Sequence, residues 1–276
     1  DGSEGFRIVN PLANERMGVS VSGGGDINGD GFDDVIIGNH LGDATLTDNG
    51  KVYVVYGGVS ELQSTVFQAS NGDRIGTAAA DTLTGTTGAN QLVGGLGNDT
   101  LIGAGGADVL YGGAGHDVMQ VNADNLAQLA LAGTSQSIAR IDGGGGIDTL
   151  KFDGTGLTLD LANVKGVAMQ NMEKVDLTGS GNNTLKLTVA DLLENFTSAN
   201  VWNAANSTTG NLGATVSRNQ LMVTGDAGDK VVLSDLANWA VTQPANVITI
   251  NGNTYTGYNL GAAQLLIDTA LTVSAT

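Results

Sequence analysis

The chain has 276 residues and a formal net charge of −17, because 28 acidic residues outnumber 11 basic ones. Such an acidic chain is a poor candidate for binding nucleic acid or an anionic membrane surface. It contains no cysteine, which excludes disulfides and thiolate metal sites. It also has no apolar run of about 18 residues, so we expect no membrane insertion.

The first unusual stretch is DINGDGFDDVIIG, residues 26–38. Two carboxylates about 4 Å apart repel each other by about 1 kcal/mol in water, so this crowding needs a compensating cation. Carboxylate, amide and carbonyl oxygens are the ligands that calcium takes, and the glycines let the loop curl around an ion. The predicted ligands in this loop are Asp26, Asn28, Asp30, Phe32 and Asp34.

The surroundings of this loop predict strands rather than helices. Val35–Ile37 and Lys51–Tyr56 are apolar and are expected to form a hairpin. An EF-hand would need a glutamate at the twelfth position, where Ile37 stands. With MGVSVSGGG before it and KVYVVYG after it, the loop resembles the FG-GAP repeat of integrin-type β-propeller blades. One such repeat cannot close a ring of typically 4 to 8 blades, so this segment should pack on the roll or on sequence outside this chain.

From Gly76 the sequence runs in consecutive units of nine residues: GTAAADTLT, GTTGANQLV, GGLGNDTLI, GAGGADVLY and GGAGHDVMQ. The sixth position is Asp or Asn in every unit, and the eighth is Leu or Met. A further unit, GGGGIDTLK at 143–151, stands alone and carries Asp148. Weaker echoes occur at 178–186 (TGSGNNTLK) and 224–232 (TGDAGDKVV).

Each unit reads as a six-residue turn followed by a three-residue strand. Glycine permits the positive φ values that such a turn needs. One turn offers too few oxygens for calcium, which takes 6 to 8, but two stacked turns offer enough. Stacking unit n on unit n+2 gives a coil of 18 residues with the eighth-position side chains inside. The pattern therefore predicts a parallel β-roll with calcium on both flanks.

These units are similar to the RTX repeats of type I secreted bacterial proteins. Units 94–102, 112–120 and 143–151 match every key position if Met119 is accepted, whereas unit 103–111 departs at Ala104. The resemblance implies several Ca²⁺ ions that bridge the sixth positions of stacked units with help from turn carbonyls. The implied ligands are Asp81, Asn90, Gly94, Leu96, Asp99, Gly103, Gly105, Asp108, Gly112, Ala114, Asp117 and Asp148.

Two short helices interrupt the strand pattern. ADNLAQLALAG, residues 123–133, has helical spacing with Asp124 as the expected cap, and TVADLLENF has Thr188 as cap. Strands are expected at 157–161, 173–177, 184–188, 220–224 and 230–233, and again in the tail. We predict an all-β fold: a right-handed parallel β-roll, extended by a β-solenoid or sandwich-like C-terminal part. The predicted segments are 1–68, 69–152 and 153–276.

Residues 153–276 resemble the C-terminal target domain of type I secreted proteins. The resemblance rests on VDLTGSGNNTLKLTVADLL, LMVTGDAGDKVVL, Trp239, NGNTYTGY and AQLLID. It implies export directed from the C-terminus, which agrees with an N-terminus, Asp1-Gly2-Ser3, unlike a signal peptide. We expect a piece of a larger protein or one exported by this route. The whole chain resembles the end of a large RTX adhesin on a Gram-negative cell surface.

The implied partners are the type I secretion machinery and the rest of the adhesin, and we expect a monomer. The chain has two histidines, His40 and His116, and no G-x-S-x-G or H-E-x-x-H motif, so we expect no enzyme and no catalytic residues. Two alternatives stay open: the C-terminal RTX module of a secreted calcium-dependent enzyme, and a calcium-dependent ligand-binding adhesin domain. In either case calcium outside the cell would drive folding.

Overall fold

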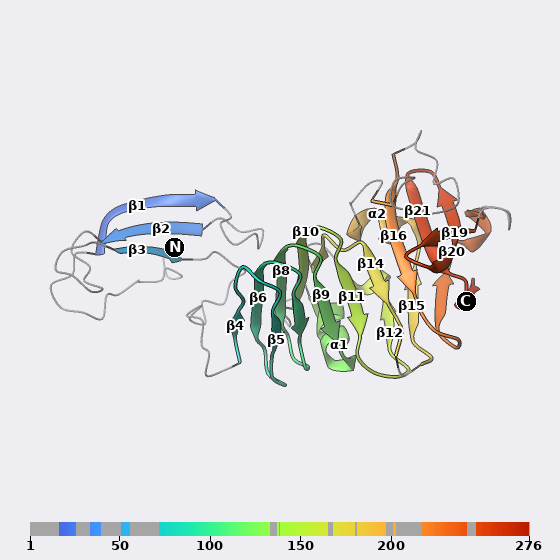
Figure 1. Cartoon of the computed structure of the whole chain (residues 1–276), viewed down its shortest axis with the longest axis horizontal. Coiled ribbons are helices and arrows are strands. Elements are labelled where there is room, and N and C mark those ends of the chain that lie inside the picture. Colours follow the sequence, from blue (N-terminus) through green and yellow to red (C-terminus); the bar gives the residue numbers. More distant parts are fainter. Residues whose placement is uncertain are drawn as a thin grey trace, which may run out of the picture. The chain divides into compact units, whose positions relative to one another are not determined.

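The computed structural model describes residues 17–25, 34–39, 51–55, 72–132, 137, 139–164, 168–179, 181–196, 201–202, 217–241 and 247–275. The chain forms two compact units, Asp1–Val66 and Phe67–Thr276, which are described separately below. The fold is mostly β, with parallel sheets and two short helices (Figure 1). The all-β class is therefore confirmed. Among the described residues, no helix has both the length and the apolar character needed to cross a membrane.

The first unit contains one antiparallel sheet in the order β1-β2-β3. Its strands are β1 Met17–Gly25, β2 Asp34–Asn39 and β3 Lys51–Val55. Ile37 of β2 lies opposite Tyr53 of β3 and Val21 of β1, so the predicted hairpin is confirmed and gains a third strand. The loop between β1 and β2, with Asp26, Asn28, Asp30 and Phe32, lies outside the described residues.

The nonapeptide units form two parallel sheets in the second unit. One contains β4 Arg74–Ile75, β6 Gln91–Leu96, β8 Val109–Ala114 and β10 Arg140–Gly145. The other contains β5 Thr82–Thr84, β7 Thr100–Ile102, β9 Val118–Val121 and β11 Thr149–Phe152. Leu92 pairs with Leu110, and Leu83 with Leu101, so each coil advances by 18 residues as predicted. This pairing is consistent with a β-roll.

The eighth-position side chains form a continuous core. Each is at most 8% exposed, and they lie in one cluster that continues into the C-terminal half. Burying such a side chain contributes about 1.5 to 3 kcal/mol, so this core holds the short strands together. The members from the nonapeptide units are Leu83, Leu92, Leu101, Leu110, Met119 and Leu150.

One coil is longer than the others. Thr149 pairs with Val118, and the backbone N–H of Asp117 reaches a side chain 31 residues further on instead of 18. The extra chain includes helix α1, Ala123–Leu131. Its N-cap is Asn122, whose side chain accepts from two backbone N–H groups, so the expectation of Asp124 as cap is wrong. Unit 143–151 is separate in the sequence, but it stacks in register on unit 112–120.

The parallel stacking continues past the nonapeptide units. β13 Met169–Gln170 and β14 Lys174–Asp176 extend the two sheets, followed in the larger one by β16 Asn219–Thr224 and β21 Ala263–Asp268. At its far edge this sheet becomes antiparallel. The strands there are β18 Ala240–Val241, β19 Ile248–Ile250 and β20 Asn253–Leu260.

A fourth sheet joins the two weaker echoes of the nonapeptide pattern. β15 Thr184–Leu187 and β17 Lys230–Leu233 pair in parallel, flanked by β12 Thr158–Asp160 and β22 Thr272–Ser274. Asn183 and Asp229 are the sixth positions, and the N–H of Asn183 donates to Oδ1 of Asp229 at 2.7 Å. Helix α2, Val189–Asn195, has the predicted cap Thr188. Two 3₁₀ turns, Leu161–Asn163 and Leu236–Asn238, complete the described elements.

Candidate metal centre

Four sixth-position aspartates form a line that we call the Asp81 ladder: Asp81, Asp99, Asp117 and Asp148. Its members are joined in one repeated way, because the backbone N–H of each donates to Oδ1 of the next. These N···O distances are 2.8 Å from Asp81, 2.8 Å from Asp99 and 2.7 Å from Asp117. The bonds fix each carboxylate against the coil before it. Strand register therefore sets the spacing of the acidic groups.

The second carboxylate oxygen of three ladder members is buried without a hydrogen-bond partner among the described residues. These atoms are Oδ2 of Asp99, Asp117 and Asp148. Each residue is at most 1% exposed. A buried, unpaired carboxylate is strongly unfavourable unless a proton or a cation neutralises it. Asp81 differs, because its Oδ2 accepts from the N–H and the hydroxyl of Thr77.

Burial raises the pKa values of two carboxyl groups in the ladder. Desolvation raises the pKa of Asp148 to about 8, with a further contribution from the neighbouring charge of Glu173. Desolvation also raises the pKa of Asp117. In the folded chain without a cation, burial therefore shifts both carboxyl groups toward the neutral, protonated form. A divalent cation beside Oδ2 would supply the neutralising charge instead.

Backbone carbonyls of the next coil converge on the same places. A Cβ on Gly94 would come within 3 Å of both Asp99 Oδ2 and the carbonyl oxygen of Gly112. A Cβ on Gly112 would meet Asp117 Oδ2 and the oxygen of Gly143 in the same way. Only glycine leaves room here, and oxygens from two coils surround the space. This donor set fits a hard cation such as calcium, which takes oxygen ligands at 2.3–2.6 Å.

The turn conformation explains how the carbonyls align. Gly95 and Gly97 have φ of 105° and 108°, and Gly113 in the next coil repeats the value of 105°. Only glycine adopts such φ values readily, because it has no Cβ. Among the described residues, no three His, Cys, Asp or Glu side chains gather as a metal cluster. One carboxylate per level would therefore act with main-chain oxygens, which explains why the repeat conserves its turn shape from unit to unit.

The other sixth positions, Asn90 and Asp108, have different surroundings. The N–H of Asn90 donates to Asp108 Oδ1 at 2.8 Å, as in the ladder. However, Asn90 Oδ1 accepts from the Thr86 N–H and, at 3.0 Å, from its hydroxyl. Oδ2 of Asp108 accepts from Nδ2 of Asn125 at 2.7 Å. On this flank, neutral donors bind the oxygens that the sequence assigned to calcium.

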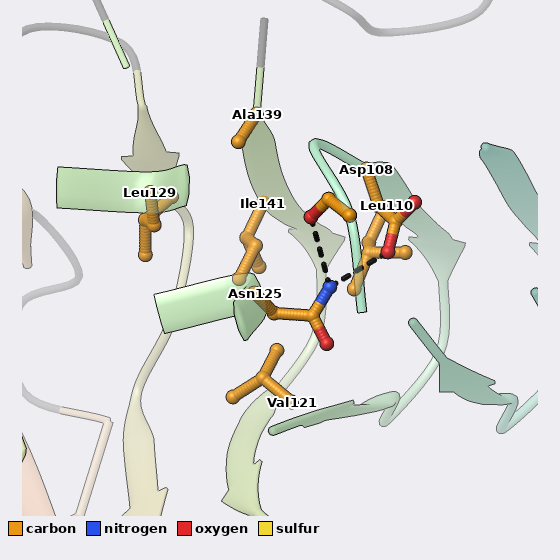
Figure 2. A pocket seen from close by; sticks show the side chains of 8 residues that line it. Asp108, Leu110, Val121, Asn125, Leu129, Ala139 and Ile141 are labelled. Carbon is orange, nitrogen blue, oxygen red and sulfur yellow. Dashed lines mark hydrogen bonds between the residues drawn. The ribbon is translucent and has the colours of Figure 1, made fainter. Parts of the chain in front are cut away.

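Asn125 reaches this position from the first turn of α1 (Figure 2). Its Nδ2 also donates to the carbonyl of Gly106 at 3.2 Å, and its Oδ1 accepts from the N–H of Gly105 at 3.1 Å. The amide thus bonds the 103–108 turn through both its ends. Burial raises the pKa of Asp108 to about 7, although the bonds from the Asn90 N–H and the Asn125 amide act in the opposite direction.

We predict that Asn125→Ala destabilises the protein by about 2 to 3 kcal/mol, because the buried Asp108 carboxyl loses its donor. For a unit of this size the melting temperature should fall by about 4 to 12 °C. Asn163→Ala is the matched control, since Asn163 is exposed on a 3₁₀ turn. Differential scanning calorimetry of both variants measures the effect. Equal melting temperatures would show that Asn125 does not hold the turn.

The remaining predicted ligands lie as follows. Leu96 and Ala114 are register partners at the ends of β6 and β8, and Leu96 is exposed. Gly103 lies beside Asp108, where a Cβ would be 2.8 Å from both Asp108 Oδ2 and Asn125 Nδ2. Asp34 begins β2 in the first unit. Sequence reasoning missed Asn125, whose role depends on how α1 docks and has no signal in the repeat pattern.

Comparison with known families agrees with this geometry. The RTX calcium-binding nonapeptide repeat matches residues 75–110 and 84–119. The FG-GAP repeat matches residues 17–55. No curated protein matches the chain significantly. The chain therefore carries a calcium-binding RTX repeat module together with an FG-GAP repeat, and RTX repeats are typical of type I secreted extracellular proteins.

Proposed function

We propose that the chain is the C-terminal module of a secreted bacterial adhesin, in which residues 69–152 fold into a calcium-loaded β-roll outside the cell. The observation that carries this proposal is the line of three buried carboxylate oxygens without hydrogen-bond partners, each facing turn carbonyls of the next coil. At the low calcium concentration of the cytosol these carboxylates repel each other. The chain then stays open for passage through a secretion channel.

The calcium affinity needed for such a switch is modest. Extracellular calcium modules bind with Kd of roughly 10⁻⁴ to 10⁻³ M, well above cytosolic calcium. In the loaded state the ions would be held by the Oδ2 atoms of Asp99 and Asp117 together with glycine carbonyls, and by Oδ2 of Asp148 together with the Asn171 carbonyl. Calcium supplies charge neutralisation and cross-links between coils. The ladder residues keep the oxygens in line, and the apolar core excludes water from behind them.

For residues 153–276 we propose a role in export and in capping the stacked coils. Its support is the continuous stacking of β14, β16 and β21 on the nonapeptide strands, which covers the last coil. The partners in this proposal are the type I secretion machinery and the rest of the adhesin, and no catalytic activity is assigned to the chain. Long tandem repeats upstream would favour an adhesin; an upstream catalytic domain would favour a secreted enzyme.

A secretion assay tests the export role. We expect a reporter fused to the N-terminus of the full chain to reach the medium of cells that carry a type I exporter. Deletion of 153–276 should retain the reporter inside the cell, because the C-terminal target is lost. Deletion of 17–55 is the control and should leave export unchanged. Equal export of both deletion variants would contradict the proposal.

A further inference from the structure

We infer that the calcium ion at the Asp148 level is completed by two residues outside the nonapeptide units, through the Asn171 carbonyl and the Glu173 carboxylate. It lies where the coil after unit 143–151 stacks on that unit. The inference rests on the proposed calcium-binding function of the ladder and adds ligands that no repeat motif contains. Asn171 and Glu173 lie in AMQNMEKVD, residues 168–176, which has no glycine and lies beyond residues 75–119 matched by the RTX repeat.

Glu173 occupies the next ladder position. β11 pairs with β14 so that Thr149 lies opposite Lys174, which places Asp148 beside Glu173. The backbone N–H of Asp148 donates to Oε2 of Glu173 at 2.8 Å. This bond repeats the one by which Asp117 N–H reaches Asp148 Oδ1 at 2.7 Å. Glu173 is 2% exposed, so its carboxylate is a buried continuation of the Asp81 ladder.

Asn171 supplies the carbonyl that a turn glycine supplies elsewhere. A Cβ on Gly143 would come within 3 Å of the Asn171 carbonyl oxygen and of Asp148 Oδ2. This is the arrangement found at Gly112 and Gly94, one and two coils earlier. Asn171 has a φ of 51°, and its Nδ2 donates to Asp142 Oδ1 at 2.8 Å. A side-chain bond thus holds the conformation that glycine would adopt in a regular repeat.

The buried Asp148 carboxylate needs a neutralising cation or proton. Asp148 is fully buried, and its Oδ2 has no hydrogen-bond partner among the described residues. Glu173, Asp117 and Asp142 are the acidic groups that act on it. Asp142 is itself paired with Arg140 at 3.1 Å. Two buried carboxylates and a main-chain carbonyl make a set of hard oxygen donors suited to Ca²⁺.

The test counts bound calcium in the full chain after equilibrium dialysis at 1 mM free Ca²⁺. Glu173→Gln should bind one ion fewer than the wild type and show a smaller rise in melting temperature on calcium addition. The exposed Glu194 allows a matched control, and Glu194→Gln should bind the full number. The double variant Asp148→Asn/Glu173→Gln should lose the same single ion, because both side chains serve one level.

The outcomes separate this inference from the proposed function. If the wild type binds no calcium, the proposed function itself fails. If the wild type binds calcium and Glu173→Gln keeps the full number, only the inferred ligand role of Glu173 is overturned. Should Glu173→Gln fail to fold, anomalous diffraction from wild-type crystals grown in calcium decides without a variant. A peak between Asp148 Oδ2 and the Asn171 carbonyl supports the site, and peaks only at the Asp99 and Asp117 levels overturn it.

Discussion

Removing calcium with EDTA is expected to lower the melting temperature of the full chain by about 8 to 16 °C and to reduce its β signal in circular dichroism. At ten times Kd each ion contributes about 1.4 kcal/mol, so three ladder levels contribute about 4 kcal/mol. A domain has a total stability of about 5 to 15 kcal/mol, so this share is large. Each kilocalorie corresponds to roughly 2 to 4 °C for a unit of this size.

Magnesium provides the control for this measurement. It demands near-octahedral geometry at 2.0–2.1 Å and gives up its water reluctantly, so it suits main-chain carbonyls poorly. Adding excess Ca²⁺ after EDTA should restore the melting temperature, whereas the same concentration of Mg²⁺ should not. A circular dichroism spectrum and melting curve indifferent to EDTA would refute calcium-dependent folding.

The second large effect is expected for Gly112→Ala. The new Cβ would collide with Asp117 Oδ2, the Gly143 carbonyl and the Met119 side chain. Overpacking of this kind costs about 1 to 3 kcal/mol, and the displaced oxygens would also lose their ion. With calcium present, we expect the free energy of unfolding to fall by roughly 3 kcal/mol. We also expect the variant to bind one ion fewer. Calorimetry and calcium counting on the same sample measure both.

Gly145→Ala is the matched control for this substitution. Gly145 lies one coil further along, in β10, and a Cβ there would have no heavy atom within 4 Å. Neither glycine has a positive φ, so the two substitutions differ in steric surroundings and not in backbone strain. Gly145→Ala should therefore leave stability and calcium binding nearly unchanged. Comparable losses of stability and of bound calcium in both variants would mean that the oxygens beside Gly112 form no calcium site.

The local features of the fold could be predicted because they repeat at short range. The nine-residue period fixes the 18-residue coil, and the eighth-position residues are apolar because they face the core. The cap of α2 also has a local signature, since Thr188 is followed by Asp191 three residues later. For the same reason the ladder through Asp81, Asp99 and Asp117 follows directly from the spacing.

The remaining features depend on packing between distant segments. Nothing in the sequence period shows that Asp148 stacks on Asp117 or that Asn125 bonds to Asp108, because α1 intervenes and the contacts are tertiary. Glu173 was missed because no glycine surrounds it, although its buried carboxylate continues the ladder. The assignment of calcium ligands to the FG-GAP loop stays a prediction, as do the three segment boundaries.

The coil of 31 residues has a consequence for how such chains diversify. The carboxylate of Asp148 stays aligned with those before it even though the connecting chain is longer and includes a helix. The alignment of the carboxylates is therefore set by the pairing of the strands, and the connection between two strands can be longer without changing it. Family searches that depend on a constant period will therefore undercount the stacked coils of such proteins. New surface segments can be inserted between two coils while the pairing of the existing strands stays the same.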